Sequence, residues 1–227
     1  MWFLPTRNRP NAVKELLEAM VEAYEVPKVA VMIDGPMYDI TFPTHWRVHQ
    51  SSTHLEMSQA LNTLYRLYPN ERWYGLMTDH SRPVTKFWST RIIENVKPME
   101  VVLVNDTKNR LNPVTGLRRI TSASVYGGEL IRTLGWVWLP TVVHMYGDDA
   151  LEKIGHALGV TYRGDVIVKD LLVREGEIPR DGNHDRLFKG QPYIARDKNA
   201  YERWLKDFPD LMVKLRLKVE QTKEKTH

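Results

Sequence analysis

The sequence predicts a single α/β domain whose mixed, mainly parallel central sheet is flanked by helices. Three observations predict this class: the length of 227 residues, an alternation of apolar runs with segments of helical periodicity, and a chain free of internal repeats and low-complexity linkers. A chain of this length is within the range of one domain and can bury a substantial core. Hydrophobic residues make up 42% and charged residues 26%, which argues against disorder or a fibrous repeat.

The first 33 residues predict a strand, a helix and a second strand. Residues 2–4 form a short apolar strand candidate that Pro5 breaks. Apolar residues recur at helical spacing over residues 13–24, and Pro27 ends this helix. The continuous apolar run over residues 29–33 is typical of a strand buried on both faces of a sheet. This order predicts a right-handed crossover unit with parallel strands.

The remaining elements continue the alternation, less regularly in the second half. A polar, aromatic loop is expected over residues 38–50. The predicted elements after it are a helix over 55–68, a strand over 73–77, a helix over 87–96, a strand over 99–104, helices at about 129–134 and 150–158, and a helical tail over 201–220. We expect residues 1–205 to form the domain and residues 206–227 to form a C-terminal helix and tail.

Composition narrows the chemistry and the location. The sequence has no cysteine, which excludes disulfides, thiolate metal sites and a cysteine nucleophile, so a metal would have to bind oxygen and imidazole ligands. No segment has eighteen uninterrupted apolar residues, and we therefore expect a cytoplasmic protein with neither signal peptide nor membrane span. The formal net charge of +4 and a pI near 9.2 favour polyanionic partners.

Polar groups follow the first predicted strands, where ligands of an open parallel sheet bind. The groups are Thr6-Arg7-Asn8, Asp34-Gly35 and Asp79-His80. Asp34 can accept hydrogen bonds from a ribose or base, Arg7 can neutralise phosphate, and Gly35 lets the backbone turn close to a ligand. The alternative is that Asp34 and Gly35 only form a tight turn.

Asp79 is the leading metal-ligand candidate. A pyrophosphate leaving group needs a divalent cation, and hard cations prefer carboxylate oxygen. His80 could add a nitrogen ligand of a kind that manganese tolerates. The alternative is that Asp79 caps a helix that begins near Val84.

Two later segments complete the candidate site. Asp148 and Asp149 open a predicted helix, and a carboxylate there could act as general base towards a hydroxyl acceptor, although acids at a helix N-terminus are also simple dipole partners. Within residues 181–186, His184 is a candidate metal ligand, and Arg186 or Lys189 would hold the diphosphate. The alternative for this segment is solvated surface.

The order and spacing of these motifs resemble the GT-A glycosyltransferases, especially the small family-2-like enzymes of bacteria and phages. The resemblance covers residues 1–205. It rests on the opening Leu4-Pro5-Thr6-Arg7-Asn8-Arg9-Pro10, on Val31-Met32-Ile33-Asp34-Gly35, on Leu76-Met77-Thr78-Asp79-His80, on Tyr126-Gly127-Gly128-Glu129 with Leu134-Gly135-Trp136, on Gly147-Asp148-Asp149 and on His184. The second acid of the family's Asp-x-Asp metal motif is missing here.

This resemblance implies a donor, a metal and a reaction. The donor would be a nucleoside-diphosphate sugar, a UDP-sugar, bound through Pro5, Thr6, Arg7 and Asp34. The metal would be Mn²⁺ or Mg²⁺, held by Asp79 and His184 with His80 as a further candidate. Asp148 or Asp149 would deprotonate the acceptor hydroxyl, and the sugar would be transferred with inversion.

The chain also resembles small phage enzymes that glycosylate modified bases in DNA. This resemblance implies that the acceptor is 5-hydroxymethylcytosine or another hydroxymethylated pyrimidine. The basic loop with Lys108, Arg110, Arg118 and Arg119 could follow a phosphate backbone, and Tyr126, Trp136 and Trp138 could stack on a flipped base. One alternative is a transferase that acts on a polysaccharide, a lipid carrier or a protein. Another is a non-catalytic nucleotide or nucleic-acid-binding module that keeps the fold.

Overall fold

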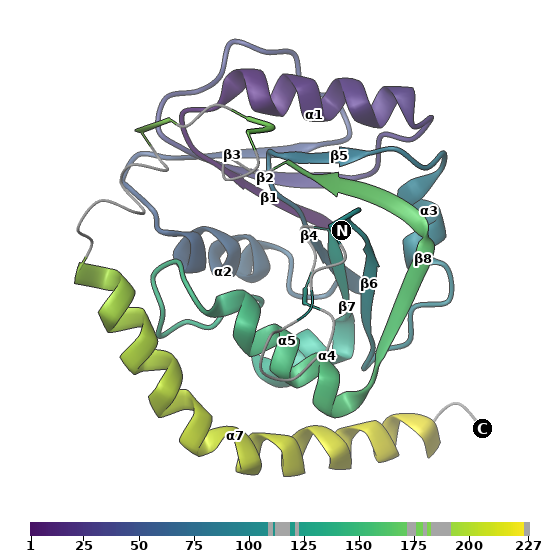
Figure 1. The fold of residues 1–227 in the computed structure, drawn as a ribbon, viewed down its shortest axis with the longest axis vertical. Coiled ribbons are helices and arrows are strands. Elements are labelled where there is room, and N and C mark those ends of the chain that lie inside the picture. Colours follow the sequence, from purple (N-terminus) through teal and green to yellow (C-terminus); the bar gives the residue numbers. More distant parts are fainter. Residues whose placement is uncertain are drawn as a thin grey trace.

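A mixed β-sheet occupies the centre of the protein, with helices packed on both of its faces (Figure 1). The computed structural model describes residues 1–108, 111, 119–120, 123–171, 176–178, 181–182 and 192–224. Within them the strand order is β3-β2-β1-β4-β7-β6-β8-β5. The strands are β1 (Trp2–Thr6), β2 (Val29–Asp34), β3 (Arg47–Ser51), β4 (Trp73–Leu76), β5 (Ser81–Pro83), β6 (Val101–Asn105), β7 (Ser124–Gly127) and β8 (Val160–Asp170). The helices are α1 (Pro10–Glu22), α2 (Met57–Leu67), α3 (Trp88–Ile93), α4 (Gly128–Leu134), α5 (Gly147–Leu158) and α7 (Pro192–Glu224).

The first part of the sheet is parallel, as the sequence predicts. β1 pairs in parallel with β2 on one side and with β4 on the other, and β2 pairs in parallel with β3. All residues of β2 are buried, as its continuous apolar run predicts. Because α1 connects β1 to β2, the predicted crossover between parallel strands is confirmed.

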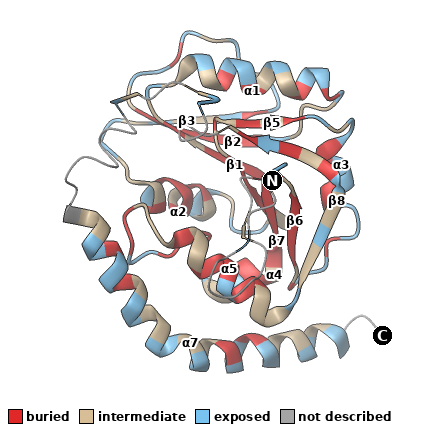
Figure 2. Ribbon diagram, in the orientation of Figure 1, coloured by how far each residue is buried: buried red, intermediate tan, exposed pale blue. Residues whose placement is uncertain are grey.

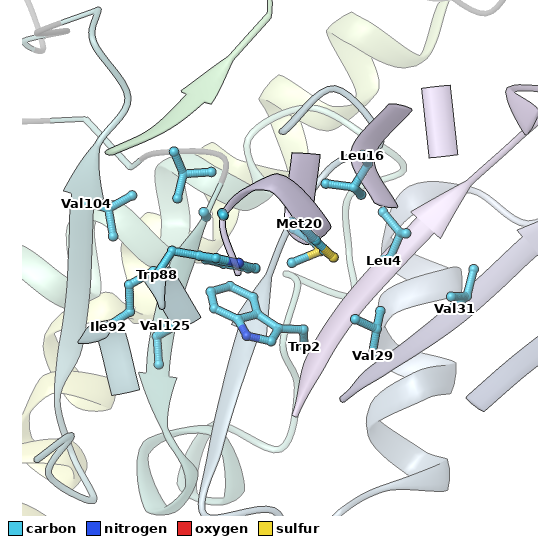
Figure 3. Close-up of a cluster of buried hydrophobic side chains, with 14 of the residues drawn as sticks. Trp2, Leu4, Leu16, Met20, Val29, Val31, Trp88, Ile92, Val104 and Val125 are labelled. Atoms are coloured by element: carbon cyan, nitrogen blue, oxygen red, sulfur yellow. The ribbon is translucent and has the colours of Figure 1, made fainter. Parts of the chain in front are cut away.

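The two faces of the sheet carry separate hydrophobic cores. One core joins β1 and β2 to α1 and α3, and its largest fully buried side chains are Trp2 and Trp88 (Figure 3). Their ring centroids lie 4.8 Å apart, and the Trp2 indole N–H donates a 2.7 Å hydrogen bond to the Ser89 hydroxyl. The other core packs against α2, α4, α5 and α7. Figure 2 shows the buried residues concentrated on the central strands and on the inward sides of the helices.

β3, β5, β7 and β8 lie where the sequence predicts no strand. β3 falls inside the predicted loop over residues 38–50, and it is an edge strand without a buried residue, so apolar alternation is absent from its sequence. β7 pairs antiparallel with β4 and β6, and β5 pairs antiparallel with β8, whereas β6 and β8 are parallel. The sheet is therefore mixed and mainly parallel, which confirms the predicted α/β class.

The helix α7 curves around the outside of the second core (Figure 1). It runs from Pro192 to Glu224 with Pro209 in its interior. Its first half packs Ala200 into a small cluster with Leu139 and Val142, and its second half buries Met212 and Leu215. Among the described residues, no helix combines the length and the apolar character that crossing a membrane requires.

Candidate active site

The ends of β1, β2 and β4 meet at one edge of the sheet. The strand register pairs Thr6 with Ile33, and it pairs Phe3 with Leu76. Asp34 is the last residue of β2, and Asp79 follows the end of β4 by three residues. The parallel arrangement therefore brings together the strand ends that the sequence singles out.

Asp79 is buried, with 4% of its surface exposed, and its carboxylate is held by three neighbours. The Thr6 hydroxyl donates a 2.8 Å hydrogen bond to one carboxylate oxygen, and the Arg9 guanidinium lies 3.3 Å from the other. His80 Nε2 lies 3.5 Å from the same oxygen as Arg9. The alternative that Asp79 caps a helix near Val84 is wrong, because Ser81–Pro83 form a strand and the helix begins at Trp88.

Arg9 links two acidic residues that are far apart in the chain. Its Nε and Nη2 atoms donate hydrogen bonds of 2.7 Å and 3.1 Å to the two carboxylate oxygens of Asp181, while Nη1 faces Asp79. Burial alone would lower the pKa of Arg9, but the hydrogen bonds and charges of Asp181 and Asp79 raise it above its ordinary value. The sequence prediction named Arg7 as the phosphate ligand and missed Arg9, since nothing local distinguishes the two arginines.

Asp34 belongs to a second charged cluster at the same edge. Its carboxylate lies 2.6 Å from His54 Nδ1 and 3.5 Å from Arg7 Nη1. His54 Nε2 in turn lies 2.9 Å from a Glu56 carboxylate oxygen. Gly35 follows with a φ of 123°, and a side chain there would meet the Asn8 amide oxygen at 3.0 Å. Asp34 thus contacts Arg7 just before the chain bends at Gly35, whereas His54 and Glu56 were not predicted as site residues.

A cavity of about 180 Å³ lies beside these strand ends. Its volume corresponds to about six water molecules, so it can hold one small ring or group. The lining residues are Pro5, Met57, Leu61, Leu76, Met77, Thr78, Ile120, Ser124, Tyr126, Trp138, Asp148 and Asp170. The cavity therefore connects the end of β1 (Pro5) and the residue before Asp79 (Thr78) with the start of α5 (Asp148).

Asp148, one of the two candidates for the general base, lines the cavity. Burial raises the pKa of its carboxyl from 3.8 to about 6, and the negative charge of neighbouring Asp149 adds to this rise. Arg119 opposes the shift only in part. A carboxyl with a pKa near 6 is ionised at neutral pH and is basic enough to accept a proton from a hydroxyl group during reaction.

Asp149 has a different environment. Arg119 Nη2 donates a 2.8 Å hydrogen bond to its carboxylate, and Arg119 Nε lies 3.6 Å from Glu152. Burial raises the pKa of Asp149 while Arg119 opposes that rise. The sequence left the choice between Asp148 and Asp149 open, and the geometry favours Asp148 because only Asp148 of the pair lines the cavity.

Other cavity residues correct or extend the sequence prediction. Tyr126 was expected to stack on a base, but its side chain is fully buried and its hydroxyl lies 2.8 Å from the Ser124 hydroxyl. Asp170, the last residue of β8, lines the cavity and was not predicted. Its position just after the apolar run over residues 166–168 was the available signal, but no strand was predicted there from the sequence.

Several predicted residues lie outside the part of the chain that the structure describes. These residues are His184, Arg186, Lys189, Arg110 and Arg118. Of the predicted metal ligands, Asp79 and His80 are described and adjacent, and the described residues contain no group of three or more acidic or histidine side chains that could hold a metal ion. The cations Lys108 and Arg119 of the basic loop are paired with Glu177 at 2.7 Å and with Asp149.

Comparisons with solved structures identify the fold. No protein-family model and no curated protein matches the sequence. The structure of GalNAc-T7 with UDP, GalNAc and Mn²⁺ is similar, with a TM-score of 0.60 and 9% identity over 92% of this chain and 49% of that chain. S. aureus TarS 1-349 is also similar, with a TM-score of 0.52 and 12% identity over 74% of this chain and 57% of that chain. The chain spans about half the length of these two structures, and it has the GT-A fold.

Proposed function

We propose that the protein is a metal-dependent glycosyltransferase that moves a sugar from a UDP-sugar to a hydroxyl acceptor. The observation that carries this proposal is the cavity that joins Asp148 to the ends of β1 and β4 in a GT-A fold. The Asp148 carboxylate, whose pKa is raised, would act as the base. The small cavity would hold the sugar, and the charged edge of the sheet would bind the nucleotide.

The reaction is a displacement at the anomeric carbon of the donor sugar. The acceptor oxygen forms a bond to that carbon as the bond to the diphosphate oxygen breaks, and the diphosphate leaves with the electron pair. The proton of the acceptor hydroxyl passes to the Asp148 carboxylate. We propose that the acceptor attacks from the face opposite the diphosphate, so that the configuration at the anomeric carbon is inverted in the product.

The nucleotide would lie along the charged edge outside the cavity. A cavity of about 180 Å³ is smaller than the roughly 300–1,000 Å³ of typical ligand sites, so it fits only the reacting part of a donor. Thr6, Arg7 and Asp34 lie at this edge, and Arg9 contacts Asp79 there. Arginine at this edge suits a diphosphate because its guanidinium donates paired hydrogen bonds to phosphate oxygens.

A divalent cation, Mn²⁺ or Mg²⁺, would be held by Asp79 and His80, with His184 as the proposed later ligand. The donor set of carboxylate oxygen and imidazole nitrogen suits Mn²⁺, and each Asp79 oxygen keeps one lone pair beyond its contact to Thr6 or Arg9. The cation would neutralise charge on the leaving diphosphate. GalNAc-T7, which shares the fold, is solved with UDP and Mn²⁺, and this supports the proposal.

Chelation and substitution of Asp79 test the metal proposal. We expect EDTA to abolish sugar transfer, Mn²⁺ to restore it, and Asp79→Ala to lower Mn²⁺ affinity at least about 10-fold in electron paramagnetic resonance titrations. Asp165→Ala removes a carboxylate that is 63% exposed, and we expect it to bind Mn²⁺ as the wild type does. Full transfer in EDTA, or unchanged Mn²⁺ binding by a folded Asp79→Ala protein, would refute the metal proposal.

For the acceptor we propose a hydroxymethylated pyrimidine, 5-hydroxymethylcytosine, in phage DNA. The formal charge of +4 and the half-buried indoles of Trp136 and Trp138, of which Trp138 lines the cavity, support this acceptor. The ion pairs of Lys108 and Arg119 weigh against it, because these cations already have acidic partners. A polysaccharide, lipid-linked or protein acceptor is the competing proposal, since sugars also stack on tryptophan.

A direct assay separates these acceptors. The protein is incubated with a mixture of UDP-sugars, Mn²⁺ and duplex DNA that is either ordinary or hydroxymethylated, and the digested nucleosides are weighed by mass spectrometry. We expect one sugar mass on hydroxymethylcytosine and none on cytosine. Hydrolysis of the UDP-sugar without any mass gain on the modified DNA would reject the DNA acceptor and favour the competing acceptors.

The second candidate function is a non-catalytic nucleotide or nucleic-acid-binding module. It is favoured by one observation, namely that the Arg9 guanidinium, 3.3 Å from the Asp79 carboxylate, already compensates the negative charge of Asp79. The raised pKa of Asp148 at the cavity opposes it, since a binding module has no need of a basic carboxylate there. Binding of UDP-sugar with neither hydrolysis nor transfer to any acceptor would favour this module.

A further inference from the structure

Asp197 is a fully buried carboxylate on the second turn of α7, with no exposed surface. One of its oxygens accepts a 2.8 Å hydrogen bond from the backbone N–H of Val143. The other accepts 2.9 Å hydrogen bonds from the N–H groups of His144 and Met145. A single carboxylate therefore binds three consecutive N–H groups of the loop that precedes α5.

This loop leads directly to the proposed base. Tyr146 follows Met145 in a left-handed conformation with a φ of 66°, and α5 begins at the next residue, so Asp148 is three residues beyond the last N–H group that Asp197 binds. Only two residues, Tyr146 and Gly147, separate the last anchored residue, Met145, from Asp148. Any movement of the anchored loop is therefore passed to the Asp148 carboxylate.

Two packing contacts reinforce the same connection. The ring of Tyr201, one helical turn after Asp197, stacks on the ring of Tyr146 with centroids 5.4 Å apart and planes at 20°. Gly147 lies so close to the Trp138 indole that an added side-chain carbon would be 2.0 Å from the ring. The backbone between Tyr146 and Asp148 is thus enclosed between α7 and a cavity wall.

The energetic balance suits a positioning device. A buried carboxylate is costly unless hydrogen bonds replace its hydration, and charge-assisted hydrogen bonds to backbone N–H groups are about twice as strong as neutral ones. Loop ordering by three such bonds fixes backbone groups that would otherwise sample several conformations. Hydrogen bonds to one loop therefore compensate the buried charge of Asp197, and that loop leads directly to Asp148.

We propose that Asp197 is a positioning residue that holds Asp148 at the cavity through the loop over residues 143–146, with Tyr201 as its partner in this task. The inference rests on the proposed function, in which Asp148 accepts the proton of the acceptor. It makes the first turns of α7 part of the catalytic apparatus.

The test uses the full chain with Asp197→Asn, Tyr201→Leu and the control Asp207→Asn. Asparagine keeps the size of Asp197 but replaces one acceptor oxygen with an amide donor that faces an N–H group. Tyr201→Leu removes the stacking on Tyr146 and leaves the three hydrogen bonds intact. Asp207 is an exposed acid on the same helix, so Asp207→Asn changes charge without touching the loop.

Two readouts do not depend on sugar transfer. In Asp197→Asn, hydrogen exchange of the amides over residues 143–149 should become at least about tenfold faster, because their anchor is lost. The pKa of Asp148, followed by carbon NMR, should fall from about 6 towards 3.8 as water reaches the carboxyl. Tyr201→Leu should change the exchange rate and the Asp148 pKa in the same directions as Asp197→Asn but by less. Asp207→Asn should change neither quantity.

Kinetics then separate positioning from general loss of structure. We expect kcat of Asp197→Asn to fall about 100-fold, the loss typical of a displacement near 1 Å, with the KM for the donor unchanged. The inference would be overturned if both Asp197→Asn and Tyr201→Leu had the same amide exchange rates, the same Asp148 pKa and the same kcat as the wild type. If no variant, including the wild type, transfers sugar while exchange and pKa respond as expected, the positioning stands and the proposed function fails.

Discussion

Replacement of Asp148 by asparagine is expected to lower the rate of sugar transfer by a factor on the order of 10²–10⁴. Asparagine has the same shape but accepts no proton at neutral pH, so the acceptor hydroxyl would lose its base. The wild-type rate should rise with pH to a plateau, with half the plateau reached near pH 6, because the pKa of Asp148 is about 6 and only the ionised form is active. Initial rates across this pH range measure both effects.

The same substitution should stabilise the folded protein at neutral pH. The pKa of Asp148 rises from 3.8 to about 6 on folding, so the folded state binds the proton more tightly and stability falls as the pH increases between these values. At pH 7 or above, Asp148→Asn should therefore gain up to about 3 kcal/mol, at 1.36 kcal/mol per pKa unit. The gain should disappear below pH 3.8, where both states of the wild type are protonated.

Asp149→Asn is the matched control for these experiments. Asp149 is bound to Arg119 and does not line the cavity, so its loss should affect the rate far less than the loss of Asp148. Equal losses of rate in the two variants would contradict the assignment of the base to Asp148. Denaturant unfolding of both variants at pH 4 and pH 7.5 measures the stability differences.

Arg9→Met is expected to destabilise the fold by about 3 kcal/mol, because removal of one partner from a buried ion pair leaves a buried charge without compensation. Arg9 has 16% of its side chain exposed, and Asp79, which would lose this partner, has 5%. Methionine keeps most of the apolar stem, so the change is mainly electrostatic. Urea unfolding at pH 7 measures the loss.

Arg91→Met provides the comparison for Arg9. Arg91 pairs with Asp165 at 2.6 Å, but the two side chains are 42% and 63% exposed. A surface pair of this kind contributes only about 0–1 kcal/mol. Equal destabilisation by the two substitutions would mean that Arg9 does not neutralise a buried charge.

The parts of the site that the sequence predicted are those that the sheet topology dictates. Asp34 and Asp79 follow apolar runs, and parallel strands place their carboxyl ends at one edge. Asp148 follows from its position at the start of a periodic helix. A local pattern and one topological rule were therefore sufficient to predict where these residues lie in the fold, while their roles stay predictions.

The missed residues depend on contacts between distant parts of the chain. Arg9 and Asp181 are separated by 172 positions, and no local pattern of either residue predicts their bidentate pair. His54 lies in a polar stretch after an exposed edge strand, where apolar alternation could not reveal the strand. Asp197 is unremarkable within a charged helix, and its burial arises only when α7 packs against the loop before α5.

The continuity of α7 links the loop over residues 143–146 to the second core of the protein. Its first turns hold Asp197 and Tyr201, its last turns bury Leu215, and Pro209 between them lacks the N–H that would complete the helical hydrogen bonding. A protease cut at this weakened midpoint would release the outer half and expose apolar surface of the second core. Under the proposed role of Asp197, such a cut would lower the rate of sugar transfer even though every residue of the cavity is unchanged.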